Sequence, residues 1–144
     1  MKKIGDDPRL QVGIERYKGF SAPTTTPTPD DLFDRFLAEL SGGELKVLLY
    51  IIRRTFGFKK AADSISLSQL CSGIRTRSGK SLDRGTGLSL SAVKLAVRSL
   101  EKRGLITVQR VKEENGYNFV NIYSLRFQER EVGQKMAYSR PEND

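Results

Sequence analysis

The stretch that most constrains the fold of this chain is Gly87–Ile106, GLSLSAVKLAVRSLEKRGLI. Either Ser89 or Ser91 can cap the first turn of a helix, because a serine hydroxyl accepts from exposed backbone N–H groups. Apolar residues then recur at the i, i+3, i+4 and i+7 spacing of one helix face: Val93, Ala96, Val97 and Leu100. Gly104 stands where a left-handed residue ends a helix, and a β-run follows. The stretch predicts a capped amphipathic helix that leads directly into a strand.

The charge balance favours a polyanionic partner. The 144 residues include 25 Lys and Arg against 17 Asp and Glu, a formal net charge of +8. Such an excess is typical of proteins that bind nucleic acid, although a soluble protein can also be basic without binding one.

The same composition argues against several other classes of protein. There is no histidine and only one cysteine, Cys71, so neither an internal disulfide nor a zinc site is expected, and no cofactor is indicated. We expect Cys71 to be a buried thiol in a reducing environment. The chain shows neither a signal peptide nor an apolar run near the ~18 residues of a membrane span, which predicts a cytoplasmic protein without membrane contact.

The order of predicted elements indicates an α+β fold that is mainly helical. We expect an extended or disordered leader over residues 1–28, a domain over 29–127 and a flexible tail over 128–144. Within the domain, helices are predicted at 29–41 (capped by Thr28), 44–56, 66–74 and 89–103, with capping boxes at Ser41/Glu44 and Ser66/Gln69 and a short strand or bridge at Ile65. Two strands at 105–111 and 119–125, joined through Asn115-Gly116, complete a winged helix-turn-helix with a two-stranded wing.

Residues 75–87, RTRSGKSLDRGTG, interrupt the predicted helix-turn-helix. A turn of three or four residues is usual at this place, so the chain carries a basic insertion in the turn. Four basic residues stand against one acidic residue, and the glycines predict a flexible loop. Extra phosphate contact and a merely solvated loop are both open interpretations. The pair Arg53-Arg54 is interpreted as a charge match to the end of helix 44–56.

The predicted recognition helix carries polar and basic residues off its apolar stripe. Lys94 and Arg98, four residues apart, project from one side and can reach a phosphate or a guanine edge, and Leu90 or Leu95 can contact a thymine methyl. Lys102, Arg103, Arg110 and Lys112 extend this basic side toward the wing. The candidate DNA-binding residues are Arg75, Arg77, Lys80, Arg84, Ser89, Leu90, Ser91, Lys94, Leu95, Arg98, Lys102, Arg110 and Lys112.

An enzymatic function is not indicated. Paired carboxylates occur only as sequence neighbours at 6–7, 30–31 and 113–114, without a partner across a cleft. Gly79-Lys80-Ser81 matches the end of a phosphate-binding loop, but the earlier glycine and the strand–loop–helix context are missing.

Three blocks of the chain resemble the N-terminal domain of the phage replication protein O family. They are Thr26–Asp34, Leu40–Phe58 (LSGGELKVLLYIIRRTFGF) and Ile65–Leu70, continued by the helix at Gly87–Ile106. The resemblance implies an origin-binding or repeat-binding replication initiator on a phage, plasmid or other mobile element. It also implies helicase-loading or other replication proteins as partners.

Two hypotheses of different classes remain open at this point. The first is a double-stranded DNA binder in replication initiation or transcriptional control, able to act as a homodimer on DNA. The second is a winged-helix protein interaction module of a replication complex, which docks through Leu90, Leu95 and the acidic pair Glu113-Glu114 at the predicted wing tip.

Overall fold

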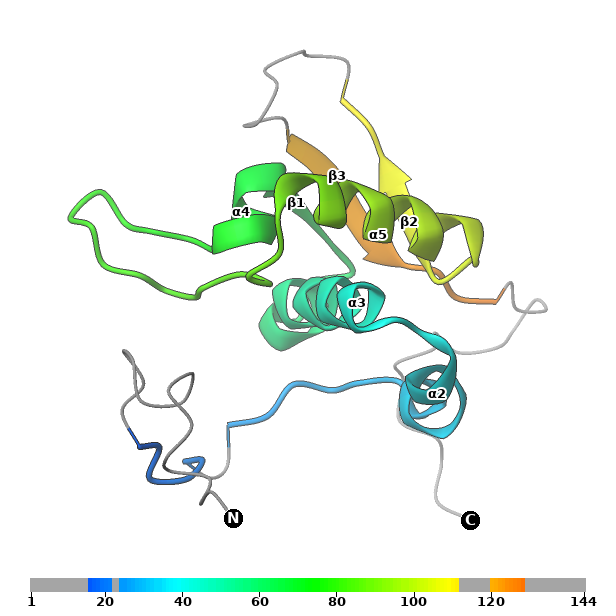
Figure 1. Cartoon of the computed structure of the whole chain (residues 1–144), viewed down its shortest axis with the longest axis horizontal. Helices are drawn as coiled ribbons and strands as arrows, with labels where there is room; N and C mark the ends of the chain where they lie inside the picture. Colours follow the sequence, from blue (N-terminus) through cyan, green and yellow to red (C-terminus); the bar gives the residue numbers. More distant parts are fainter. Residues whose placement is uncertain (1–15, 22–23, 112–119, 129–144) are drawn as a thin grey trace, which may run out of the picture.

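The computed structural model describes residues 16–21, 24–111 and 120–128. In these residues the chain forms helices and one antiparallel sheet (Figure 1). The elements are η2 (Leu32–Phe36), α2 (Leu37–Glu39), α3 (Gly42–Thr55), η3 (Phe56–Phe58), β1 (Ala62–Ser66), α4 (Leu67–Ser72), α5 (Leu90–Lys102), β2 (Ile106–Gln109) and β3 (Val120–Leu125). The α+β class is confirmed.

Hydroxyl caps begin the main helices where the sequence predicts them. The Ser41 hydroxyl accepts from the Glu44 N–H at 3.1 Å, and the Glu44 carboxylate accepts from the Ser41 N–H at 2.9 Å. Ser66 and Gln69 form the same reciprocal box at α4. Ser89, rather than Ser91, caps α5 by accepting from the Ala92 N–H at 3.2 Å. Each cap satisfies donors that a helix start leaves free.

The strands form one sheet of three, in the order β1-β3-β2. The expected two-stranded wing was therefore incomplete, because β1 pairs antiparallel with β3 along its whole length. Ile65 lies opposite Asn121, and Val108 lies opposite Tyr123. The added strand satisfies the second edge of β3, which a two-stranded hairpin would leave unpaired.

The core lies between α3, α4, α5 and one face of the sheet. The predicted stripe of α5 is confirmed, since its four apolar residues are at most 5% exposed. They pack with residues of α3, α4 and the strands, including Ile51, Leu70 and Tyr123. Cys71 is buried in this core, as predicted. Gly104 ends the helical region at a φ of +81°, the left-handed conformation expected of it.

The first helical segment is less buried than its sequence suggested. Leu32 and Leu40 are buried, but Phe33 and Leu37 are 55% and 52% exposed. The Thr28 hydroxyl donates to the Thr26 carbonyl at 3.2 Å, so it does not cap the segment as expected.

Several predicted features fall outside the described residues, namely most of the leader, the turn with Asn115-Gly116 and the tail beyond Gln128. In the parts of the chain that the structure describes, no helix is both long and apolar enough to cross a membrane.

Candidate nucleic-acid interface

Helix α5 presents one polar face because its apolar stripe is turned into the core. Five of the candidate residues on this helix are exposed: Ser91, Lys94, Leu95, Arg98 and Lys102. Leu95 is 70% exposed. Among the described residues, Lys94, Arg98 and Lys102 have no ion-pair partner. This face therefore carries uncompensated positive charge that a polyanion can neutralise.

Two candidate residues at the start of α5 have structural roles. Leu90 was expected off the apolar stripe, but it is half-buried and packs against the core. The Ser89 hydroxyl is engaged in the cap of α5 and lies 3.3 Å from the Ser91 hydroxyl. A ligand contact by either residue would therefore have to share the side chain with these internal contacts.

A buried carboxylate on α3 anchors the far end of α5. The Glu44 carboxylate, which also completes the capping box, accepts from the Ser99 hydroxyl and from Arg103 Nε at 2.8 Å. Burial would raise the pKa of Glu44, but hydrogen bonds from Ser99, Ser41 and Arg103 outweigh it and lower the pKa to about 2. Arg103 was expected to extend the basic side toward the wing. It is instead paired internally, with 38% of its side chain exposed.

The insertion 75–87, here called the insertion hairpin, extends away from the body of the molecule beside α4 and the start of α5 (Figure 1). The sequence predicted a flexible loop here, and the structure shows a hairpin with internal hydrogen bonds. Arg75 and Ser81 form an antiparallel bridge, and the Thr76 N–H donates to the Lys80 carbonyl at 2.8 Å. At the base, the Thr86 N–H and hydroxyl both donate to the Leu70 carbonyl, at 2.9 and 2.6 Å.

The four cations of the insertion hairpin are exposed, whereas its single carboxylate has internal partners. Arg75, Arg77, Lys80 and Arg84 have no ion-pair partner among the described residues. The Asp83 carboxylate accepts from the Tyr50 hydroxyl at 3.1 and 3.2 Å and from the Gly85 N–H at 2.8 Å. Its charge is thus held at the base of the hairpin, while no described residue pairs with the positive charges.

Arg54 connects this base to the rest of the fold. Its guanidinium donates to Asp63 on β1 at 2.9 Å, to the Tyr50 hydroxyl at 3.2 Å and to Gln69 on α4 at 3.3 Å. We call Tyr50, Arg54, Asp63, Gln69 and Asp83 the Arg54 cluster.

The sequence interpretation of Arg54 as a simple charge match to the helix end missed this role. The available signal was an arginine within a helix that is apolar nearly all round, since a charge buried there needs partners. Burial raises the pKa of Tyr50, and the nearby Asp83 carboxylate adds to the rise while Arg54 opposes it.

The last two candidate residues, Arg110 and Lys112, do not add to the exposed cations described above. Arg110 donates to both oxygens of Glu101 at 2.9 and 2.8 Å, so its charge is compensated. Lys112 lies outside the described residues.

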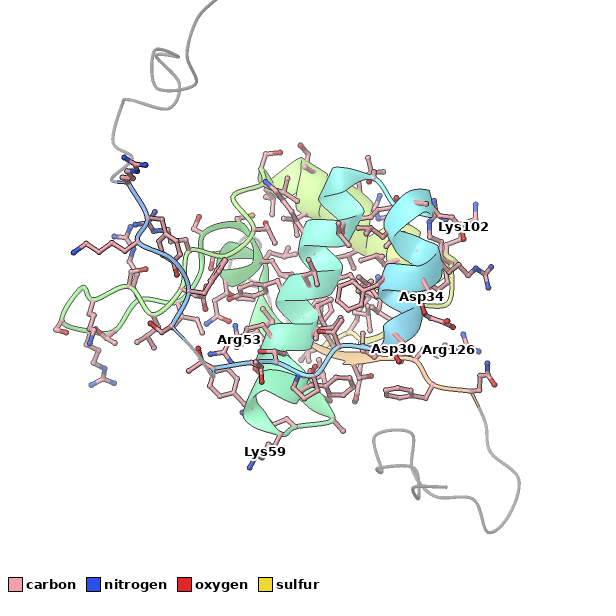
Figure 2. The ribbon with its side chains drawn as sticks, turned by 90° about the horizontal axis from the view of Figure 1, so that it is seen from below. Asp30, Asp34, Arg53, Lys59, Lys102 and Arg126 are labelled. Carbon is pink, nitrogen blue, oxygen red and sulfur yellow. The ribbon has the colours of Figure 1, made fainter. Side chains whose placement is uncertain are left out.

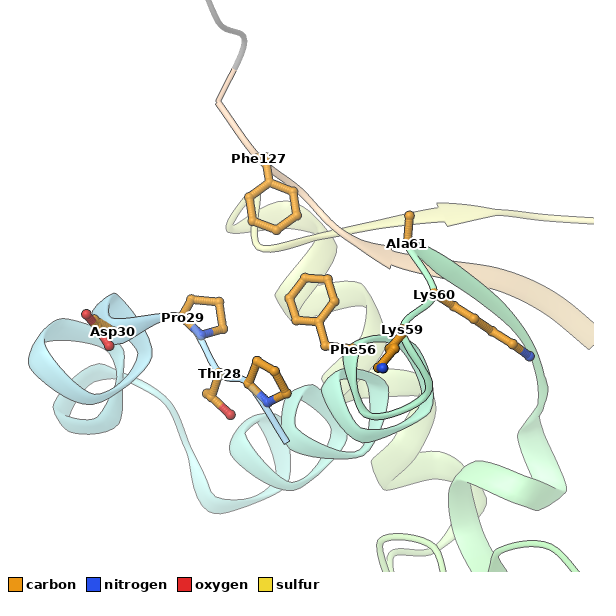
Figure 3. Close-up of a pocket in the computed structure, with 9 residues that line it drawn as sticks. Thr28, Pro29, Asp30, Phe56, Lys59, Lys60, Ala61 and Phe127 are labelled. Carbon is orange, nitrogen blue, oxygen red and sulfur yellow. The ribbon is translucent and has the colours of Figure 1, made fainter. Parts of the chain in front are cut away.

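The underside of the molecule has mixed charge. Figure 2 labels Arg53, Lys59 and Arg126 in this view together with Asp30 and Asp34, and Lys102 at the end of α5 is also visible from this side. A pocket of about 580 Å³ also opens here between residues 27–30, Phe56, Lys59–Ala61 and Phe127 (Figure 3). Phe56 and Phe127 stack in it with ring centroids 5.9 Å apart. Across the described ranges there is no group of three acidic, His or Cys side chains that could hold a metal ion.

The sequence matches the family model described as bacteriophage replication protein O over residues 26–122, more than half of the chain. The chain belongs to the bacteriophage replication protein O family. The matched region contains the Arg54 cluster, the insertion hairpin and α5. Membership of this family indicates a role in phage replication. No curated protein and no solved structure matches the sequence.

Proposed function

We propose that this protein is a winged-helix, double-stranded DNA-binding protein of the replication-initiator type, which binds an origin or repeated sites. The observation that carries the proposal is the charge of Lys94, Arg98 and Lys102 on the exposed face of α5, which no described residue pairs with, next to a hairpin whose exposed charges are all positive.

In this proposal α5 lies in the major groove and the β2–β3 hairpin serves as the wing. Lys94 and Arg98 are one helical turn apart and contact phosphates or a guanine edge. Leu95 contacts a thymine methyl, and Ser91 lies at the N-terminal end that faces the bases. Lys102 and the insertion hairpin contact phosphates on either side of the segment that α5 recognises, and two copies on adjacent half-sites form a homodimer on the DNA.

The test is fluorescence anisotropy with a duplex pool at rising salt. We expect Lys94→Gln with Arg98→Gln to weaken binding about 10- to 100-fold and to reduce the log–log salt slope by about 2, because two phosphate neutralisations are lost. The matched control is Lys59→Gln with Arg126→Gln, which removes the same charge from the underside and should leave the slope unchanged. The proposal is wrong if the wild-type protein does not bind DNA at low salt.

The exposure of Leu95, 70%, favours a second candidate function as a docking module for a helicase-loading or other replication protein. Leu95→Ser separates the two functions. Loss of capture of replication proteins with DNA affinity kept within about threefold supports docking, whereas loss of sequence preference on DNA supports the groove contact.

A further inference from the structure

The insertion hairpin cannot be held in place by apolar packing. Its one large apolar side chain, Leu82, is 60% exposed, and its four cations repel one another. Any fixed direction of the hairpin must therefore come from polar contacts at its base.

Hydrogen bonds from Thr86 and Gly87 tie the base to α4, and Asp83 supplies the contact with α3. Its carboxylate accepts from Tyr50 on α3 and from the Gly85 N–H, while its carbonyl accepts from the Ser81 hydroxyl at 2.9 Å. A Cβ on Gly73 would lie only 2.4 Å from Asp83 Oδ1, so the backbone after α4 passes directly against this carboxylate. The Asp83 side chain thus joins the C-terminal side of the hairpin base, at Gly85, to Tyr50 on α3.

Tyr50 is itself firmly held. Its side chain is 8% exposed, and its hydroxyl accepts from Arg54 while donating to Asp83. Arg54 also contacts β1 through Asp63 and the Ser64 carbonyl at 3.2 Å, and α4 through Gln69. The hairpin base is therefore tied to α3, which also packs against α5.

We propose that Tyr50 and Asp83 are positioning residues that fix the direction of the insertion hairpin relative to α5, so that its cations meet DNA phosphates beyond the segment contacted by α5. This inference rests on the proposed DNA-binding function. Neither residue touches DNA. Their contact removes the cost of ordering the hairpin at the moment of binding, which is the general benefit of a preorganised surface.

The experiment is a salt titration of duplex binding by the full chain. We expect Tyr50→Phe, which removes only the shared hydroxyl, to weaken binding about tenfold and to reduce the salt slope by about 1 to 2 as hairpin contacts are lost. Thr55→Val is the matched control on the same helix. It removes a fully buried hydroxyl, bonded to the Ile51 carbonyl at 2.8 Å, that has no contact with the hairpin, so the salt slope should not change.

Asp83→Ala distinguishes positioning from charge alone. Removing an acidic group from a DNA-binding protein should tighten binding if only electrostatics matter. Positioning predicts the opposite, a loss of at least about threefold with a lower salt slope. Asp83→Ala also tests the inference if Tyr50→Phe fails to fold, as judged by circular dichroism.

A double-mutant cycle completes the test. In a variant with Arg75→Gln, Arg77→Gln, Lys80→Gln and Arg84→Gln, Tyr50→Phe should have no further effect on affinity, because the contacts it positions are already gone. An additive loss would mean that Tyr50 acts through general stability and would overturn the inference. Wild-type affinity and slope in both Tyr50→Phe and Asp83→Ala would do the same while leaving the proposed function intact, whereas absence of wild-type binding would contradict the proposed function itself.

Discussion

Helix α5 and the insertion hairpin both present cations that have no ion-pair partner in the described part of the chain, but the two elements are held in different ways. The helix is held by four apolar residues, each at most 5% exposed, that pack into the core. The hairpin is held by hydrogen bonds at its base, from Thr86 to the Leu70 carbonyl and from Tyr50 to Asp83. Apolar burial supports an element over its whole length, whereas hydrogen bonds fix only the points that they join.

The two kinds of support predict which substitutions will disrupt each element. A single truncation on α5 leaves the other stripe residues in place. The hairpin depends on a few close approaches around Gly73, Asp83 and Gly85, where backbone segments nearly touch.

The largest effect is expected from Gly73→Ala. Gly73 has a φ of +88°, and an added Cβ would lie 2.1 Å from the Asp83 carbonyl oxygen, so both strain and collision oppose the substitution. We expect a loss of about 3 kcal/mol in the free energy of unfolding. Urea denaturation followed by circular dichroism measures it.

Gly79→Ala is the matched control, since Gly79 has a φ of +89° at the hairpin tip but no atom within 4 Å of the added Cβ. Only the backbone strain remains, and we expect a loss of about 1 kcal/mol. Equal losses for the two variants would show that the close approach at Gly73 contributes nothing.

A smaller loss of folding stability is expected at low pH, when Glu44, which anchors the end of α5, becomes protonated. Glu44 has a pKa of about 2 in the folded chain, below the ordinary glutamate value of 4.5. Its ionised form therefore stabilises the fold fully above the unfolded pKa, and this contribution is lost as the pH falls from about 4.5 through 2. On the order of 2 kcal/mol should be lost across this window.

Glu44→Gln isolates this contribution because the amide oxygen can still accept from the Ser41 N–H. Thermal unfolding of both proteins between pH 7 and 2 gives the comparison. The variant should be less stable at pH 7, and the difference between the two proteins should shrink as the solution becomes acidic. A difference that stays constant with pH would contradict the role assigned to the ionised carboxylate.

The helices could be predicted from the sequence, whereas the contacts that hold the hairpin could not. Helical periodicity and hydroxyl caps predicted α3, α4 and α5, because both signals lie within a few neighbouring residues. The contact between Tyr50 and Asp83 joins residues 33 positions apart, and no local pattern marks it. The third strand was underestimated for the same reason, since β1 is recognised by its pairing with β3 rather than by its own five residues.

Sequence reasoning had the same limit at the candidate site, where it predicted the cations but not their ion-pair partners. Its exposed cations on α5 and the hairpin were predicted from residue type and helical spacing. Whether a cation is free depends on partners elsewhere in the chain, and Arg103 and Arg110 lie in ion pairs with Glu44 and Glu101.

The smallest change in stability, with a modest gain in DNA affinity, is expected from Glu101→Gln on α5. The Glu101 carboxylate pairs with Arg110, and the hydrogen bond from Arg110 lowers the pKa of Glu101. Because this pair is partly exposed, stability should change by no more than about 0.5 kcal/mol. The substitution frees Arg110 and removes an acidic group next to Lys102, so DNA binding should tighten by about two- to threefold at low salt.

Glu39→Gln on α2 is the matched control, because it breaks a similar exposed pair with Arg35 at 3.1 Å on a different helix. It should leave DNA affinity unchanged. Anisotropy at two salt concentrations measures both variants, and the gain from Glu101→Gln should shrink at the higher one because exposed charges are screened. Tightening by both variants alike would mean that net charge alone controls binding, and that the α5 face has no special place in it.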